Sequence, residues 1–402
     1  MTSPQRAPGG FPVVGIIGGG QLARMCAAPA AELAITLSVL AEAPDAAAAQ
    51  VIPSAPVGDY TDVETVRAWA RECDVVTFDH EHVPADVLAA LAADGVTLHP
   101  SPDALHFAQD KLAMRERMTA IGVACPAWAP ARTAADVEAF GAEHGWPVIA
   151  KTPRGGYDGK GVRVVNRPED VADWLDLAAQ QDGTTGPLAD GILLEEKVDF
   201  VRELAVLIAR SPMGQAAAWP VVETVQTDGI CTEVLAPAPG LDPDLAAVVT
   251  EAGLRIAESL SVTGVFAIEM FEVTDPGTGA PAYVVNELAM RPHNSGHWSM
   301  DGAVTGQFEQ HLRAVLDLPL GSPTPRAPFT VMANVLGGDH PELYPAYRHV
   351  MARDPELKVH LYGKGVRPGR KIGHVNLTGT DLADLRERAG HAADYLTGVI
   401  TE

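Results

Sequence analysis

The segment WPVIAK at residues 146–151 is followed by TPRGGYDGKG at 152–161 and VRVV at 162–165, and it carries the clearest structural signal in the chain. The apolar runs predict two strands, and the intervening glycines predict a hairpin loop with exposed backbone N–H groups. Such a loop, with Lys151 ending the first strand, suits phosphate binding. It is not a Walker A loop, because no Gly-Lys-Ser/Thr precedes a helix. A flexible hairpin without a ligand is the alternative at this point.

Upstream, residues 11–100 alternate between strand and helix patterns, which predicts a Rossmann-like, doubly wound parallel sheet. The predicted strands are 13–17, 35–40, 75–78 and 96–98; the predicted helices are 21–33, one that a Thr61–Glu64 capping box opens, and one that Pro84 opens. Gly18-x-Gly20 with Glu42 matches a dinucleotide fingerprint, so an oxidoreductase is one interpretation. The same glycine turn also suits any phosphate, or close packing of the helix.

Further along, a helix is predicted from Ser101 to Gly122, with Lys111 inside it. The runs 192–198 and 202–207 predict a strand that turns into a charged segment and then continues. Backbone groups beside residues 195–198 can read an adenine edge, and Glu203 can accept from ribose hydroxyls. Solvated charges at a strand end are the alternative.

Two apolar strands each carry a carboxylate. Glu269 interrupts the run 265–273, and Asn286 with Glu287 interrupts 283–288. A carboxylate inside a strand is costly unless it is paired or binds a cation. Neighbouring strands that each offer one carboxylate favour a Mg²⁺ site completed by phosphate oxygens and water. Two glutamates facing solvent are the alternative.

Three polar segments complete the set of candidates. Residues 79–82, DHEH, follow a predicted strand at the edge where ligands bind, and Glu81 is a candidate hydroxyl acceptor. Residues 291–298, RPHNSGHW, predict a cleft-lining loop in which Arg291 suits phosphate; Pro292 and Gly296 disfavour a helical zinc pair. Residues 364–371, KGVRPGRK, predict a basic turn for a compact phosphate, with a surface loop as the alternative.

Composition excludes several classes of function. The 402 residues carry 29 Lys and Arg against 52 Asp and Glu, a net charge of −23, which argues against nucleic-acid binding and anionic membranes. No segment has the length and apolarity of a membrane span or of a signal peptide. The four cysteines form no CxxC pair, so a reduced, cytoplasmic protein is expected.

Taken in order, Lys151, the glycine loop, residues 195–198, Glu203, Glu269 and the Asn286-Glu287 pair resemble the ATP-grasp superfamily. Within it, GGGQLARM (18–25), PSP…AQDK (100–111), AKTPRGGYDGKG (150–161), NELAMRPHNSGHW (286–298) and VRPGRKIGH (366–374) resemble the N5-carboxyaminoimidazole ribonucleotide synthase family. The resemblance implies a biotin-free carbon–nitrogen ligase of purine biosynthesis. In that reaction ATP phosphorylates bicarbonate to carboxyphosphate, and the amine of 5-aminoimidazole ribonucleotide captures the carboxyl group.

The resemblance also implies roles for individual residues. ATP would be bound by Lys111, Lys151, Gly156, Asp158, Gly159, Gly161, Glu195, Glu196, Lys197, Val198, Glu203 and Asn286. Mg²⁺ would be bound by Glu269 and Glu287. The catalytic group would be Tyr157, Lys160, Arg291, His293 and Asn294. The ribotide would be bound by Gly20, Gln21, Leu22 and Glu81, and its phosphate by Lys364, Arg367, Arg370 and Lys371.

The implied fold class is α/β and α+β. It comprises a Rossmann-like domain at 11–100, an ATP-grasp domain at 101–325 with a mobile glycine-loop lid at about 124–197, and a small C-terminal domain at 326–402. A homodimer is expected from the resemblance. Ala23, the Met290-Arg291 pair and the run TFDHEHVP (77–84) depart from the family pattern; in that run Asp79 and His80 differ, while Glu81 and His82 are retained. The rivals are a formate-using transformylase or carboxylase subunit of the same superfamily, the oxidoreductase, and a nucleotide-binding regulator without catalysis.

Overall fold

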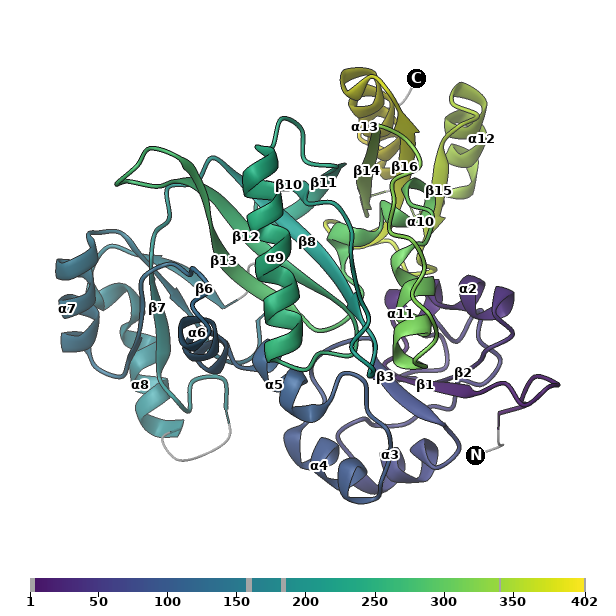
Figure 1. Ribbon diagram of the computed structural model, residues 1–402, viewed down its shortest axis with the longest axis horizontal. Coiled ribbons are helices and arrows are strands. Elements are labelled where there is room, and N and C mark those ends of the chain that lie inside the picture. The colour runs from purple at the N-terminus through teal and green to yellow at the C-terminus, as the bar shows by residue number, and fades with distance from the viewer. Residues whose placement is uncertain (1–3, 157–160, 182–185, 340, 401–402) are drawn as a thin grey trace.

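A computed structural model of the chain describes residues 4–156, 161–181, 186–339 and 341–400. Figure 1 shows three regions: an N-terminal domain, a lobe that holds α7 and α8, and a central sheet that continues into a C-terminal lobe. Each region has its own β-sheet. The predicted fold class of mixed α/β domains is confirmed.

The N-terminal sheet is parallel, in the order β2 (Thr36–Leu40), β1 (Val13–Ile17) and β3 (Val75–Phe78). Every residue of β1 and β3 is buried, as continuous apolar runs predict for parallel strands. The predicted fourth strand at 96–98 is wrong: this segment makes one isolated bridge, between Val76 and Leu98. Helices α1 (Gln21–Met25), α2 (Ala27–Glu32), α3 (Val63–Ala70) and α4 (Ala85–Ala93) complete this domain.

Helix boundaries in this region differ from the prediction in two places. The predicted helix 21–33 is split at Cys26, which ends α1 and precedes α2. The predicted Thr61–Glu64 capping box is wrong, because Asp62 caps α3 by accepting from the Glu64 N–H, while Thr61 bonds to Asp59. A carboxylate one residue later satisfies the same unpaired N–H groups.

The predicted helix from Ser101 to Gly122 is also two helices. Ser101 caps α5 (Pro102–Gln109) as predicted, but Asp110 adopts an extended conformation and caps a second helix, α6 (Lys111–Ala120). Its carboxylate accepts from Leu112 N and Ala113 N at 3.0 Å. Lys111 is therefore the first residue of a helix, not an interior one.

The lobe consists of a four-stranded antiparallel sheet, ordered β4 (Trp128–Ala131), β7 (Ile192–Glu196), β5 (Val148–Lys151) and β6 (Val162–Val165). β5 and β6 form the predicted hairpin around the glycine loop. Helices α7 (Ala134–His144) and α8 (Ala172–Gln181) and the 3₁₀ helix η1 (Pro168–Val171) cover it and give it a hydrophobic core of its own.

The central sheet has nine strands, ordered β13-β12-β8-β10-β11-β14-β16-β15, with β9 paired to β8. Their bounds are β8 Arg202–Arg210, β9 Ala216–Ala218, β10 Val222–Thr227, β11 Ile230–Ala236, β12 Gly264–Thr274, β13 Pro281–Ala289, β14 Phe329–Leu336, β15 Lys358–Leu361 and β16 Lys371–Gly379. Because β14 pairs with β11, this sheet runs across the predicted boundary at 325 into the C-terminal segment.

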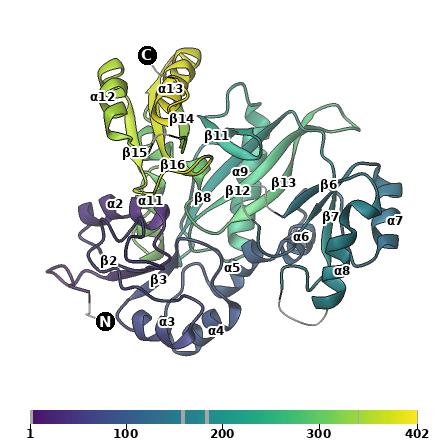
Figure 2. The same ribbon diagram turned by 180° about the vertical axis from the view of Figure 1, so that it is seen from behind.

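Helices cover this sheet and join it to the N-terminal domain (Figure 2). The bounds are α9 Pro243–Ser259, η2 Asn294–Gly296, α10 Ser299–Gly302, α11 Gln307–Val315, α12 Tyr344–Arg353 and α13 Leu382–Thr397. His311 of α11 bonds Thr77 of β3 at 2.9 Å and accepts from Val265 N of β12 at 3.0 Å. This buried bridge fixes the edge of the N-terminal sheet against the carboxylate-bearing strands.

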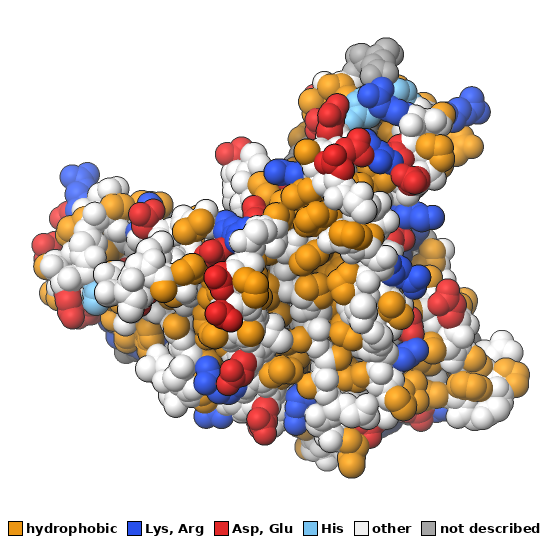
Figure 3. Space-filling model, turned by 45° about the horizontal axis from the view of Figure 1, so that its top comes forward, with side chains coloured by type: hydrophobic (Ala, Val, Ile, Leu, Met, Phe, Trp, Pro, Cys, Tyr) orange, Lys and Arg blue, Asp and Glu red, His pale blue; other side chains and the backbone are white. Residues whose placement is uncertain are grey.

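One face of the molecule shows how charged side chains are distributed. The face drawn in Figure 3 mixes acidic, basic and apolar side chains and carries no continuous basic patch. Among the described residues, no helix is long and apolar enough to cross a membrane.

Candidate active site

A cleft of about 2260 Å³ lies where the three regions meet. It brings together nearly all of the predicted site residues that the structure describes: Gly20, Gln21, Leu22, Glu81, Lys111, Lys151, Gly156, Glu195, Glu196, Lys197, Val198, Glu203, Glu269, Asn286, Glu287, Arg291, His293, Asn294, Lys364, Arg367, Arg370 and Lys371. Gly161 is the exception. Tyr157, Asp158, Gly159 and Lys160 lie outside the described residues. Gln21 and Lys364, which are 343 positions apart in the chain, are in direct contact in this cleft.

A β-bulge shapes the floor of the cleft. Glu269 of β12 pairs with Glu287 of β13, but the next pair is Met270 with Val285, so Asn286 has no partner residue on β12. Successive strand residues normally point to opposite faces, and a bulge changes the direction of one of them. Asn286 and Glu287 therefore both line the cleft, although they are adjacent.

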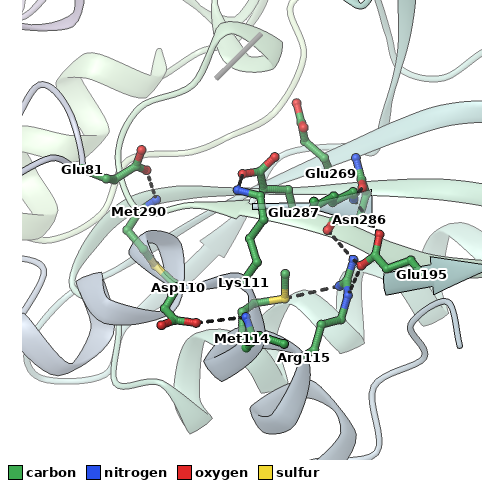
Figure 4. A network of polar contacts seen from close by, with 12 residues as sticks. Glu81, Asp110, Lys111, Met114, Arg115, Glu195, Glu269, Asn286, Glu287 and Met290 are labelled. Carbon is green, nitrogen blue, oxygen red and sulfur yellow. Dashed lines mark hydrogen bonds and ion pairs between the residues drawn. The ribbon is translucent and has the colours of Figure 1, made fainter. Parts of the chain in front are cut away.

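Two lysines contact the residues of this floor, and Figure 4 shows one of them, Lys111, beside Glu287. Lys111 Nζ lies 2.7 Å from Glu287 Oε1, and its side chain is 13 % exposed. Lys151 Nζ lies 2.9 Å from Asn286 Oδ1 and 2.7 Å from Glu195 Oε2. Lys111 is therefore not the solvated helical lysine that its sequence context alone favours. Both cations lie where a polyphosphate would meet the carboxylates.

The sequence analysis missed Arg115 of α6. Its side chain is fully buried; Nε donates to Glu195 Oε1 at 2.5 Å and Nη2 to the Asn286 carbonyl at 2.7 Å. Both carboxylate oxygens of Glu195 are thus engaged by Arg115 and Lys151. The available signal is its position four residues after Lys111, which places both cations on one helix face.

The adenine and ribose candidates lie at the ends of β7 and β8. Lys197 and Val198 follow the last residue of β7, so their backbone groups are outside the strand ladder. Glu203 begins β8 with Arg202, and burial raises its pKa while Gln226 lowers it. Gln226 and Phe271 also line the cleft and were not predicted.

The pKa values of the two facing carboxylates are shifted in opposite directions. Burial, Glu287 and Glu203 raise the pKa of Glu269 to about 7. Burial opposes ionisation of Glu287 too, but Lys111 and Lys151 lower its pKa below the usual range. Like charges on neighbouring strands cannot both ionise cheaply without a cation between them.

These residues fit a magnesium ion. Glu269 and Glu287 are directly opposite across an antiparallel pair, where Cβ atoms are about 4.5–5.5 Å apart. Two carboxylates plus nucleotide phosphates are a usual Mg²⁺ environment. No group of three or more His, Cys, Asp and Glu within the described ranges has metal-binding geometry, so phosphate or water must supply the other ligands.

Beside the carboxylates, the segment 291–297 forms the predicted polar loop. Arg291 Nε lies 3.2 Å from Glu81 Oε2, while Glu81 Oε1 accepts from Met290 N at 2.8 Å. His293 Nδ1 is 2.9 Å from Ser295 Oγ, and Nε2 is 3.6 Å from Glu269 Oε1. Burial, Arg291 and Lys371 lower the pKa of His293 to about 3, so this imidazole is neutral at physiological pH.

The glycine turn after β1 does not favour a dinucleotide. Asp79 Oδ1 accepts from Ala23 N at 2.7 Å, so a carboxylate already occupies the N-terminus of α1. A Cβ on Gly20 would lie 2.0 Å from Asp79 Oδ2, which is why glycine is required there. Glu42 accepts from Gly19 N at 3.0 Å and lies 3.5 Å from His80 Nε2, instead of projecting toward a ribose.

The basic turn between β15 and β16 forms the wall opposite the glycine turn. Lys364 Nζ lies 2.5 Å from Gln21 Oε1, so the turn and the glycine segment are in contact. Gly337 accepts from Gly369 N and donates to the Arg370 carbonyl, which pins the turn to the end of β14. Lys364, Arg367, Arg370 and Lys371 all line the cleft.

Known families match in the same order as these regions. The ribonucleotide synthetase preATP-grasp domain matches residues 12–109, the ATP-grasp domain matches 116–308, and the phosphoribosylaminoimidazole carboxylase C-terminal domain matches 330–388. Together with two lysines facing two strand carboxylates, this defines an enzyme of the ATP-grasp class.

The individual relatives identify the family. The N5-carboxyaminoimidazole ribonucleotide synthase of Mycobacterium tuberculosis (strain ATCC 25618 / H37Rv) is 52% identical over 391 residues, covering 96% of this chain and 88% of the relative. That of Corynebacterium ammoniagenes is 48% identical over 396 residues, covering 98% and 94%. The chain belongs to the N5-carboxyaminoimidazole ribonucleotide synthase family, and it is an ATP-grasp ligase.

Solved structures agree over the whole length. The Thermus thermophilus N5-carboxyaminoimidazole ribonucleotide synthetase is 35% identical with a TM-score of 0.81, covering 97% of this chain and 99% of that one. The Aspergillus clavatus N5-carboxyaminoimidazole synthase, in complex with ADP and 5-aminoimidazole ribonucleotide, is 30% identical with a TM-score of 0.83, covering 96% and 98%.

Proposed function

We propose that this enzyme carboxylates 5-aminoimidazole ribonucleotide on its exocyclic amine, using ATP and bicarbonate and releasing ADP and phosphate. The single observation that carries the proposal is one cleft lined by two separate groups of cationic side chains, each suited to phosphate. Lys111 and Lys151, beside the Glu269–Glu287 pair, form one wall, and the turn 364–371 forms the other. A nucleoside triphosphate and a ribotide monophosphate need two such walls.

ATP would lie between the central sheet and the lobe. Backbone groups at Lys197 and Val198 would meet the adenine, Glu203 the ribose, and Lys111 and Lys151 the phosphates. Mg²⁺ held by Glu269 and Glu287 would neutralise phosphate charge when bound. Because that ion would replace Lys111 as the partner of Glu287, Lys111 would become available to phosphate oxygens.

The chemistry divides into two transfers. A bicarbonate oxygen attacks the γ-phosphorus, the bond to the β-phosphate oxygen breaks, and carboxyphosphate and ADP form. The amine then attacks the carboxyl carbon, the carbon–oxygen bond to phosphate breaks, and the amine proton leaves with phosphate. Arg291, held by Glu81, faces the developing negative charge, and neutral His293 and Asn294 orient the acceptor by hydrogen bonds.

The other interpretations explain less of the cleft. A dinucleotide oxidoreductase conflicts with Asp79 at the start of α1 and with Glu42, whose carboxylate is bonded to Gly19 N. A regulator without catalysis leaves the paired carboxylates unexplained. A formate-using ligase shares the ATP wall and differs only in the acceptor, so it is separated by experiment.

The test is ADP release by purified protein with MgATP, omitting bicarbonate and the ribotide one at a time. We expect ADP release that the ribotide stimulates, and a carboxylated ribotide whose formation requires bicarbonate. If neither omission matters, the acceptor assignment is wrong. Turnover restored by formate would identify the competing ligase.

The basic turn makes a prediction of its own. Lys364→Met should raise the KM for the ribotide roughly 10- to 100-fold, the loss expected for one charge-assisted hydrogen bond to phosphate. The KM for ATP should stay unchanged, because Lys364 bonds Gln21 of the glycine segment, which the proposal assigns to the ribotide. Lys358→Met, an exposed residue on β15, is the matched control. Equal changes in the KM for the ribotide and the KM for ATP would contradict the assignment of the turn 364–371 to the ribotide phosphate.

A homodimer and a cytoplasmic location stay predictions. Light scattering during size-exclusion chromatography tests the first, and a monomer at micromolar concentration would contradict it.

A further inference from the structure

We propose that Arg115 is a positioning residue for ATP: by sharing the charge of Glu195 it leaves Lys151 with an uncompensated positive charge facing the cleft. The inference rests on the proposed function only in that the cleft binds ATP. Arg115 itself does not line the cleft, so it acts through Glu195 and the strand that carries Asn286.

The first argument is the closed ring of contacts that Arg115 completes. Arg115 donates to Glu195, Glu195 accepts from Lys151, Lys151 donates to the side chain of Asn286, and Arg115 donates to the carbonyl of Asn286. Figure 4 shows Arg115 reaching from α6 to Glu195 and Asn286. Two members of this ring, Lys151 and Glu195, belong to the lobe sheet; Asn286 belongs to the central sheet. The ring therefore joins the two sheets between which ATP would lie.

The second argument is the charge count. Arg115 and Lys151 supply two cations against the one anion of Glu195, so the cluster carries a net charge of +1. Burial opposes ionisation of Glu195, but Arg115 and then Lys151 lower its pKa, so the carboxylate stays ionised. Without Arg115, the Lys151–Glu195 pair would be neutral and the lysine would bind its partner instead of a phosphate.

The third argument is the bulge. The register shift leaves Asn286 without a partner residue on β12. The Asn286 carbonyl accepts a hydrogen bond from Arg115 Nη2. A half-buried carbonyl gains from a charged donor, so this contact stabilises the conformation in which Asn286 and Glu287 both face the cleft. The Arg115 guanidinium thus affects both the net charge around Lys151 and the conformation of β13 next to Glu287.

The experiment measures the dissociation constant of MgATP in the absence of ribotide and bicarbonate, for wild type, Arg115→Met and the double variant Arg115→Met/Glu195→Gln. Arg115→Met should weaken ATP binding roughly 10- to 100-fold, as when one charge-assisted hydrogen bond is lost. The KM for the ribotide should not change. The double variant, which restores the net charge of +1, should recover most of the ATP affinity. Arg117→Met is the control, because Arg117 lies on the same helix and its side chain bonds the Ser259 carbonyl of α9.

A purely structural role predicts a different pattern, because the double variant removes the same side-chain volume and more hydrogen bonds. Failure of Glu195→Gln to restore ATP binding would overturn the inference, and so would wild-type ATP affinity in Arg115→Met. If Arg115→Met does not fold, the double variant carries the test: near wild-type ATP affinity supports the inference, and weak affinity or loss of the fold overturns it. A chain that binds ATP but carboxylates nothing would fail the proposed function and leave this inference standing.

Discussion

Glu287→Gln should lower kcat by about a thousandfold or more while the protein stays folded. Glutamine keeps the size of the side chain but removes the charge that would bind Mg²⁺ and that now pairs with Lys111 at 2.7 Å. The loss should appear in ADP release with and without the ribotide, since the metal acts at the first transfer. Steady-state kinetics over a range of Mg²⁺ concentrations measures it.

Two controls accompany the Glu287→Gln measurement. Glu258→Gln, an exposed carboxylate on α9, should leave kcat unchanged and serves as the control for charge removal. Circular dichroism and the thermal midpoint should show a folded Glu287→Gln variant. Unchanged turnover in that folded variant would refute the metal role of Glu287.

Glu269→Gln should also abolish turnover, but it should stabilise the metal-free protein at alkaline pH. Since the pKa of Glu269 is raised to about 7 in the folded protein, the folded state holds a proton that the unfolded state has lost between about pH 4.5 and 7. Stability therefore falls as pH rises through this window, and the whole penalty is present above pH 7. Glutamine does not titrate and removes it.

The expected gain is about 1–3 kcal/mol in the free energy of unfolding at pH 8, and close to zero at about pH 4, where Glu269 is protonated in both states. Denaturant unfolding at the two pH values, without Mg²⁺ or nucleotide, measures the difference between variant and wild type. If the difference in the free energy of unfolding between Glu269→Gln and wild type does not change with pH, the raised pKa of Glu269 is contradicted. In wild type, added MgATP should release a proton near pH 7 by ionising Glu269, which calorimetry in buffers of different ionisation enthalpy detects.

Local patterns were enough to predict much of the fold. β1 and β3 have the predicted bounds, because continuous apolar runs between turn residues leave a buried strand as the consistent solution. β6 also has the predicted bounds, although Val162 and Val164 are exposed. The carboxylates of β12 and β13 could be predicted because a carboxylate inside an apolar strand is costly unless it is paired or binds a cation. The family followed from the order of these motifs.

Helix boundaries were predicted less well, because capping is a competition among neighbouring polar residues. Thr61 and Asp62 are both good caps, and only the conformation of the chain shows that Asp62 is used. Asp110 reads as an interior helical residue, yet its carboxylate also accepts from Arg154 Nε at 2.9 Å, a residue 44 positions away. That distant partner stabilises the break that begins α6.

The sequence by itself determined the class of enzyme, the glycine-loop and basic-turn segments proposed for phosphate, and the carboxylate pair, because each depends on residue types within a short window. Only the tertiary structure decided that Lys111 pairs with Glu287, that a bulge turns Asn286 into the cleft, and that Arg115 shares Glu195 with Lys151. These contacts join residues up to 176 positions apart. Their charge balance depends on burial and distance, which arise only when the sheets pack against each other.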